Sequence, residues 1–309
     1  MQWYKDFEKD IAQVFIETQQ IVEKFPPPLN HKGLAYLSKF DIRQDDSTKN
    51  YICYLLPFWC NDISQLKKDT IVRLSVGNVL AMLYFFIQDD LMDSQDSLDR
   101  DQVPLANLLY IHFFEIYLAY FPFDSPFWAY FHQYIVEWTD GVANEPHEDY
   151  FQTDLIKIAR KAAPLKLSST AVLLLSNQSN LVFTASDMID HVLVTLQMAD
   201  DWNDWEDDYT ENNYNGLISL IRFKHDQSDI ISIEEIKRAI FVQDIMQYYT
   251  KFAISNHTYI EQLNLNLPYL LSFHHTLVNH LKRDAESINE KKRLQASGGL
   301  NYWLSKNIK

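Results

Sequence analysis

Two groups of aspartates are the residues of this sequence best suited to chemistry. The first lies in FFIQDDLMD, residues 85–93, and the second in LQMADDWNDWEDD, residues 196–208. Carboxylates this close together repel one another unless a cation compensates. Mg²⁺ prefers carboxylate oxygens and commonly adds water and phosphate ligands. The two groups therefore predict magnesium chemistry on a phosphorylated substrate, and their members are Asp89, Asp90, Asp93, Asp200, Asp201, Asp204 and Asp208.

Each group ends an apolar run with helical spacing. Asp89 and Asp93 are four residues apart, so their carboxylates project from one face of a helix. Asp200, Asp204 and Asp208 follow the same spacing and form a row on one face of a second helix. A helix C-terminus already carries partial negative charge, which makes acids there unfavourable without a cation. If the two helices face each other in a bundle, divalent ions must lie between them.

The net charge of −15 is concentrated in these groups. Residues 89–101 hold six acids and one arginine, and residues 200–211 hold seven acids and no base. The rest of the chain is nearly neutral. An acidic run is often only a solvated surface, but two runs that each follow an apolar helix favour a site. The same balance argues against nucleic acid as a partner, because phosphates need a basic surface.

The elements that must position these groups are helices. Apolar residues recur every three or four positions almost throughout, and only 6 glycines are present, few for a protein rich in tight turns. Pro26 to Pro28 end a first helix. We expect further helices over about 31–42, 49–60, 65–94, 103–121, 124–140, 148–178, 183–209, 233–255 and 264–290. No linker or internal repeat interrupts them, so the sequence predicts one all-α domain over 1–309, with a flexible tail over 295–309.

The aspartate groups resemble the motifs of a known enzyme superfamily. DDLMD at 89–93 is similar to the first DDxxD motif of class I isoprenoid enzymes. LQMADDWND at 196–204 is similar to the second motif of trans-prenyl diphosphate synthases, and its spacing also fits the metal motif of class I terpene synthases. The resemblance implies a single-domain helical bundle with a central active-site cavity. There, three Mg²⁺ ions would bind the diphosphate of an allylic prenyl substrate and help it leave a carbocation.

The resemblance assigns roles to the aspartates and to nearby bases. Asp89 and Asp93 would hold two Mg²⁺ ions with Asp90 in support, and Asp200, Asp204 and Asp208 would hold the third, with Asp201 beside them. A lysine or arginine that contacts the diphosphate lies upstream of the second motif in the family, and KIARKAAPLK offers Lys157, Arg160 and Lys161, which we expect on one helix. Ala162 replaces the family's usual threonine. The predicted catalytic residues are Asp89, Asp93, Asp200, Arg160 and Lys161.

Aromatic side chains next to both motifs could shield a carbocation. Ring faces attract cations without attacking them. Tyr84, Phe85 and Phe86 precede the first motif, and Trp202 lies within the second. The family places bulky residues at the positions of Tyr84 and Phe85 as a pocket floor, which implies a short or folded substrate. Aromatic residues at helical spacing also suit a plain core, so both interpretations stand.

Departures from the family pattern bear on the reaction. Chain-elongating synthases bind isopentenyl diphosphate through an early glycine–lysine–arginine motif and two arginines after the first DDxxD. NHKGL at 30–34 is a poor match to the former, and SQDSLDRD at 94–101 is acidic where the arginines are expected. We therefore expect a class I terpene synthase, a carbon–oxygen lyase, with a trans-prenyl diphosphate synthase as the alternative. A catalytically inactive helical scaffold or regulatory subunit is a third interpretation, whereas a di-iron bundle would need Glu-x-x-His pairs that the sequence lacks.

The remaining features indicate where the protein works. The polar amino terminus MQWYKDFEKD argues against a secretory signal, and no apolar run in the sequence pattern is long enough to predict stable membrane insertion. Cys53 and Cys60 suit buried free thiols in a reducing compartment. We expect a cytoplasmic enzyme whose partner is a prenyl diphosphate, and a homodimer is compatible with the pattern.

Overall fold

The computed structural model describes residues 1–93, 99–145, 147–225 and 231–296, together with 298, 299, 304 and 307. Every regular element in these ranges is a helix, so the predicted all-α class is confirmed. The chain divides into two compact units. Unit 1 comprises Met1–Glu137, Ala162–Asp187 and Leu265–Leu270, and unit 2 comprises Trp138–Lys161, Met188–Asn264 and Leu271–Lys309.

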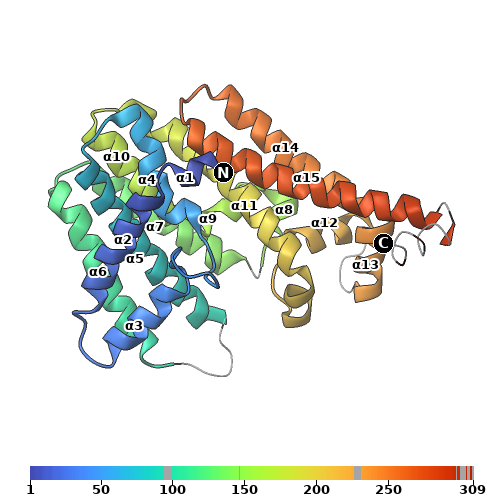
Figure 1. The fold of residues 1–309 in the computed structure, drawn as a ribbon, viewed down its shortest axis with the longest axis horizontal. Helices are drawn as coiled ribbons and strands as arrows, with labels where there is room; N and C mark the ends of the chain where they lie inside the picture. Colours follow the sequence, from blue (N-terminus) through green and yellow to red (C-terminus); the bar gives the residue numbers. More distant parts are fainter. Residues whose placement is uncertain are drawn as a thin grey trace. The chain divides into compact units, whose positions relative to one another are not determined.

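Unit 1 is built around the long helix α5, Lys68–Asp93 (Figure 1). Its residues are apolar on every side over most of its length, as in a helix enclosed by others. In the described part of the chain, four α-helices pack against it. Three of them belong to the first part of the chain, and the fourth, α10, comes from the middle of the chain. These are α2 (Glu8–Val22), α4 (Tyr51–Ser64), α6 (Gln102–Tyr120) and α10 (Lys166–Leu175). The short helices α1 (Gln2–Lys5), α3 (Leu29–Ser38), η1 (Ala163–Leu165) and η2 (Ser179–Leu181) complete the unit.

Unit 2 contains most of α11, Val182–Glu211, and the helices that follow it. These are α12 (Gly216–Lys224), α13 (Ile233–Val242), α14 (Ile245–Gln262) and α15 (Pro268–Ala296), preceded by α8 (Tyr150–Thr153) and α9 (Lys157–Arg160). Helices α14 and α15 run side by side (Figure 1), and the Nδ1 atoms of His257 and His274 lie 2.8 Å apart between them. His274 is fully buried, and its Nε2 lies 2.8 Å from the Thr195 hydroxyl of α11. Helix α7, Phe127–Asn144, begins in unit 1 and ends in unit 2.

Two helix predictions are wrong in detail, and one helix was missed. The helix expected over 148–178 is broken into α8, α9, η1 and α10, because Asp154 is extended (φ −159°) and Pro164 lacks the N–H that a continuous helix needs. The helix expected over 233–255 is interrupted at Asp244, which adopts a left-handed conformation (φ 61°) and separates α13 from α14. Helix α12 was not predicted. Most of the predicted tail over 295–309 lies outside the described residues.

Two helices of unit 1, α5 and α6, are long and apolar enough to span a bilayer by length and composition alone. The two helices differ in how far they are buried. In α5, 78% of the apolar window is buried inside the protein, whereas in α6 the buried share is 33%. The apolar character of α5 therefore has a sufficient explanation in the core. Helix α6 keeps exposed apolar residues such as Val103 and Ile111.

Candidate active site

The first aspartate group ends α5 in unit 1. Asp89 is half-buried, Asp90 is exposed, and Asp93 is the last residue of the helix, with its side chain outside the described part of the structure. Tyr36 of α3 donates its hydroxyl to Asp90 Oδ2 over 2.8 Å. Burial, followed by the hydrogen bond and charge of Asp90 and the charge of Asp89, raises the pKa of Tyr36. Tyr36 therefore stays a donor and fixes one carboxylate of the group, a role that the sequence did not reveal.

The single lysine of NHKGL lies one turn before Tyr36 on α3. Lys32 Nζ lies 2.8 Å from Asp99 Oδ2 and 2.8 Å from Asp101 Oδ2, beyond the first motif. These hydrogen bonds raise the pKa of Lys32 and lower that of Asp99. The positive charge of this lysine is thus already engaged by two carboxylates of the chain.

The aromatic residues before the first motif point to different neighbours. Tyr84 and Phe85 contact each other, with ring centroids 4.8 Å apart, and both approach Phe113 of α6, at 5.8 and 6.4 Å. Phe86 instead contacts Phe40, at 5.1 Å. All three are half-buried. Tyr84 and Phe85 thus form an aromatic cluster with Phe113, Phe86 makes a separate contact with Phe40, and the predicted contact of all three with substrate stays a prediction.

The second group lies on α11 in unit 2. Asp200, Asp204 and Asp208, hereafter the aspartate row, occupy successive turns of that helix, and the first two are exposed to solvent. Loss of hydration, followed by the charges of Asp201 and Asp204, raises the pKa of Asp200 to about 7. Burial likewise raises the pKa of Asp208. The row therefore holds more negative charge than its surroundings compensate, which is the condition that a bound cation relieves.

Asp201 points away from the row and joins α11 to α12. Its carboxylate is buried and accepts hydrogen bonds from Gln197 Nε2 and the Gly216 N–H, both at 2.9 Å, and from the Tyr249 hydroxyl at 3.4 Å. Burial raises its pKa to about 6, although the Gln197 and Gly216 hydrogen bonds oppose this. A Cβ atom on Gly216 would lie 2.9 Å from Asp201 Oδ2 and 2.8 Å from the Phe151 ring, so this contact requires glycine. The structure thus gives Asp201 a packing function.

Asn215 connects the aspartate row to the start of α12. Its Oδ1 accepts the N–H groups of Leu217 and Ile218, at 3.0 and 3.1 Å, and so caps the helix. Its Nδ2 donates to Asp208 Oδ2 and to the Asp201 carbonyl, both at 2.8 Å. One buried side chain therefore caps the start of α12 and orients the last carboxylate of the row. An asparagine before a glycine is the sequence signal that could have predicted this cap.

The three predicted diphosphate-binding bases lie together in unit 2, although not on a long helix: Lys157 and Arg160 begin and end the single-turn α9, and Lys161 follows it. Each forms an ion pair with an acid of the segment 140–148: Lys157 with Glu148 at 2.5 Å, Lys161 with Glu145 at 2.7 Å, and Arg160 with Asp140. Lys161 also acts on the second motif, because its charge opposes the burial that raises the pKa values of Asp201 and Asp208. Among the predicted site residues of unit 2, the structure therefore brings the three bases together, and the charge of Lys161 extends to Asp201 and Asp208.

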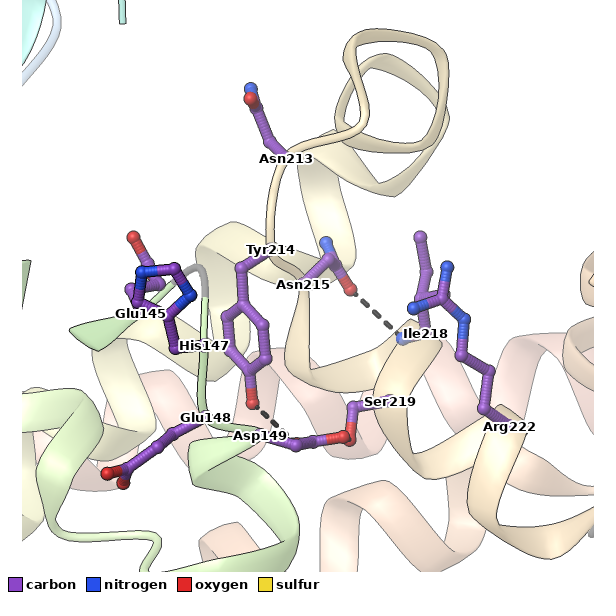
Figure 2. A pocket seen from close by; sticks show the side chains of 10 residues that line it. All are labelled: Glu145, His147, Glu148, Asp149, Asn213, Tyr214, Asn215, Ile218, Ser219 and Arg222. Carbon is purple, nitrogen blue, oxygen red and sulfur yellow. Dashed lines mark hydrogen bonds between the residues drawn. The ribbon is translucent and has the colours of Figure 1, made fainter. Parts of the chain in front are cut away.

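A cavity of about 220 Å³ lies beside this arrangement (Figure 2). Tyr214 spans it and donates its hydroxyl to Asp149 Oδ1 over 2.9 Å, and Ser219 donates to the same carboxylate. Arg222 lines the cavity, and its buried Nε has no hydrogen-bond partner in the described part of the chain. The lining is polar and charged, which suits ions better than a hydrocarbon chain. Its residues are Glu145, His147, Glu148, Asp149, Asn213, Tyr214, Asn215, Ile218, Ser219 and Arg222.

Trp202 contacts α15 in unit 2. Its indole N–H donates to Asp284 Oδ2 over 2.8 Å, and this carboxylate also lies 3.6 Å from His280 Nε2. The indole is therefore anchored between two helices of the unit. A substrate contact of Trp202 stays a prediction from the sequence.

Comparisons with known proteins show which fold these helices form. No family model and no curated protein matches the sequence. The solved structures that are similar over most of the chain include the following three. Geranylgeranyl pyrophosphate synthase of Lactobacillus brevis ATCC 367 has a TM-score of 0.68 at 15% identity, covering 91% of this chain and 97% of its own. The synthetase of the same product from the archaeon Geoglobus acetivorans has 0.66 at 16%, covering 88% and 99%. Decaprenyl diphosphate synthase of Rhodobacter capsulatus has 0.67 at 11%, covering 93% and 98%.

The chain has the isoprenoid synthase fold. The fold predicted from the two motifs is confirmed. At these identities the likeness establishes the architecture, so the roles assigned to individual residues stay predictions.

The residues of this isoprenoid synthase fold suit magnesium in their chemistry. The aspartate row offers hard oxygen donors, and loss of hydration, followed by the charges of Asp201 and Asp204, raises the pKa of Asp200. Within the described ranges, no three His, Cys, Asp or Glu side chains converge into a preassembled metal site. The donors are arranged along helix faces instead, as expected where diphosphate oxygens complete the coordination.

Proposed function

We propose that this protein is a magnesium-dependent prenyltransferase that ionises an allylic prenyl diphosphate and joins the prenyl group to an acceptor. The observation that carries the proposal is the aspartate row with Lys161 at its end, on a chain with the isoprenoid synthase fold. The similar structures support this reaction over the terpene synthase that the sequence favours, since all three are named as synthases of prenyl diphosphates.

The reaction breaks the bond between the allylic carbon and oxygen, and its electron pair leaves with the diphosphate. Bound Mg²⁺ would neutralise the negative charge that develops on the leaving diphosphate. In this proposal Asp89 and Asp93 hold metal at the first motif, and Tyr36 fixes Asp90 beside them. The aspartate row holds metal at the second motif, where Asn215 orients Asp208.

The bases and aromatic residues complete the proposed mechanism. Lys161, Arg160 and Lys157 bind the diphosphate oxygens, since cations placed at a developing charge stabilise it most effectively where water is excluded. The aromatic residues Tyr84, Phe85 and Phe86 lie directly before the first motif and would shield the allylic cation. We retain three ions, a cytoplasmic location and a homodimer as predictions.

One observation favours a terpene synthase as the second candidate. Lys32 of α3, the lysine of NHKGL, is already paired with Asp99 and Asp101. A second diphosphate at this lysine would have to displace two carboxylates, and their charges would repel it. An enzyme that ionises a single prenyl diphosphate has no such need. An acceptor without a diphosphate would reconcile the prenyltransferase with the same observation.

A product assay separates these candidates. Purified protein with Mg²⁺ is incubated with geranyl, farnesyl, geranylgeranyl or geranylfarnesyl diphosphate, each with and without isopentenyl diphosphate, and the products are identified by mass spectrometry. A longer prenyl diphosphate that forms only with isopentenyl diphosphate supports the prenyl diphosphate synthase. A hydrocarbon or alcohol from the lone substrate supports the terpene synthase. No product and no diphosphate release under any condition would instead favour the inactive scaffold.

A further inference from the structure

Three bases and three acids face one another one to one near the second motif. The bases are Lys157, Arg160 and Lys161, and their partners Glu148, Asp140 and Glu145 come from the end of α7 and the residues before α8. The bases proposed to bind diphosphate thus already hold carboxylates of the chain. If these bases bind the diphosphate, its anionic oxygens must displace the three carboxylates.

The fold brings these two segments together at short range. A Cβ atom on Gly141 of α7 would lie 3.0 Å from Arg160 Cβ and 3.1 Å from the Lys161 N atom, so the two backbones are in close contact. Tyr150 donates its hydroxyl to the Gly141 carbonyl over 2.9 Å and holds the end of α7 there. The ion pairs follow from a fixed backbone contact and not from chance encounters of long side chains.

Lys161 differs from its two neighbours because its charge reaches the second motif. It opposes the rise in pKa that burial causes at Asp201 and Asp208. The Lys161 side chain is 28% exposed and that of Glu145 is 21% exposed, so water screens this pair less than a surface pair. The ammonium group of Lys161 therefore interacts electrostatically both with the Glu145 carboxylate and with Asp208 of the aspartate row.

We propose that Glu145 is an internal competitor of the diphosphate for Lys161. The Glu145 carboxylate holds the ammonium group when no substrate is bound, and the more highly charged diphosphate displaces it on binding. Glu145 then lowers the affinity for diphosphate in two ways: its bond to Lys161 must be broken, and its charge repels the ligand. The inference rests on the proposed function, and it adds a residue that sets the affinity of that site.

A purely structural ion pair leads to a different expectation. If Glu145 only fastened α9 to the end of α7, its removal would lower the stability of unit 2 and leave or weaken diphosphate binding. As a competitor, its removal tightens binding even where stability falls. Affinity for inorganic pyrophosphate therefore separates the two roles.

The test is calorimetric titration of the full-length protein with inorganic pyrophosphate in the presence of Mg²⁺. We expect Glu145→Gln to bind pyrophosphate about 3- to 10-fold more tightly than the wild type, the range for losing one partly screened like charge. Asp154→Asn is the matched control, because it removes the same charge from an exposed acid three residues before Lys157 and keeps the oxygen that accepts the Ile156 N–H. Its gain in affinity should be clearly smaller.

Each outcome decides for or against the proposal. Unchanged or weaker binding by Glu145→Gln overturns it while leaving the proposed function intact if the wild type binds. An equal gain in both variants also overturns it, since general charge would then suffice. If the wild type itself fails to bind pyrophosphate with Mg²⁺, the proposed function falls together with this inference. Should Glu145→Gln not fold, Glu145→Asp retains the charge but shortens the side chain, and we expect its affinity to lie above that of the wild type.

Discussion

Replacing Asp200 with asparagine removes one charge from the aspartate row while preserving the shape of the side chain. The pKa of Asp200 is higher in the folded protein, about 7 against 3.8, so the folded state binds this proton more tightly than the unfolded state does. Its contribution to stability is therefore fully present below pH 3.8 and is lost as the pH rises through about 7. At pH 8 without metal, the ionised carboxylate destabilises the wild type.

The size of this effect follows from the same shift. A pKa rise from 3.8 to about 7 corresponds to about 4 kcal/mol for a fully buried group. Because the Asp200 side chain is exposed, solvent screening reduces this, and we expect Asp200→Asn to be more stable by about 1–2 kcal/mol. At roughly 2–4 °C per kcal/mol, the melting temperature in EDTA at pH 8 should rise by about 2–8 °C.

Magnesium should reverse the order of the two proteins. A ligand that binds only the folded state raises the melting temperature, so Mg²⁺ should stabilise the wild type and stabilise Asp200→Asn much less. Scanning calorimetry at pH 5 and pH 8, with EDTA or Mg²⁺, measures both effects. Asp207→Asn is the control, because Asp207 is an exposed acid on the same helix outside the row. If Asp200→Asn melts at or below the wild-type temperature in EDTA at pH 8, or keeps the full response to Mg²⁺, the account of the row is wrong.

Three further predictions concern contacts that the structure revealed. Gly216→Ala forces a Cβ atom against the Asp201 carboxylate and the Phe151 ring, so thermal unfolding should show that the free energy of unfolding falls by about 1–3 kcal/mol. Gly299→Ala is the control and should be neutral, because nothing lies within 4 Å of the added atom. Equal stability of the two variants would contradict the packing argument. Tyr36→Phe removes a donor to Asp90, and half-saturation by Mg²⁺ in the diphosphate-release assay should need a higher concentration while the melting temperature stays nearly constant; an unchanged requirement would show that the bond does not matter. Burial lowers the pKa of His274 from 6.5 to about 3, so the contribution of the neutral imidazole to stability is present above pH 6.5 and is lost as the pH falls towards 3. In melting curves measured against pH, His274→Gln should therefore lose less stability on the acid side than the wild type. An unaltered slope would show that His274 does not cause this loss.

The sequence predicted the fold because its determinants are local and periodic. Helix α5 is apolar for most of its length and ends in the first aspartate group, so both its type and its place in the core follow from pattern. The second helix, α11, extends through the whole aspartate row as expected. Both motifs also carried the resemblance that identified the fold.

The parts that sequence reasoning missed depend on contacts between segments far apart in the chain. The bond from Tyr36 to Asp90 joins two helices 54 residues apart, and no spacing rule could show it. The hydrogen bonds that Asp201 accepts from Gly216 and Tyr249 also join distant segments, and its predicted metal role stays a prediction. The ion pair of Lys161 with Glu145 depends on a backbone contact at Gly141 that only tertiary packing creates.

The most direct test of the account measures pyrophosphate release from an allylic prenyl diphosphate, with isopentenyl diphosphate also present, by the wild type, Asp89→Asn, Asp200→Asn and Asp207→Asn. We predict that the wild type releases pyrophosphate only with Mg²⁺, that Asp89→Asn and Asp200→Asn are slower by about 100-fold or more, and that Asp207→Asn retains the wild-type rate. Release that continues at the wild-type rate in both motif variants, or that does not depend on Mg²⁺, would contradict the claim that the two aspartate groups hold the metal for ionisation.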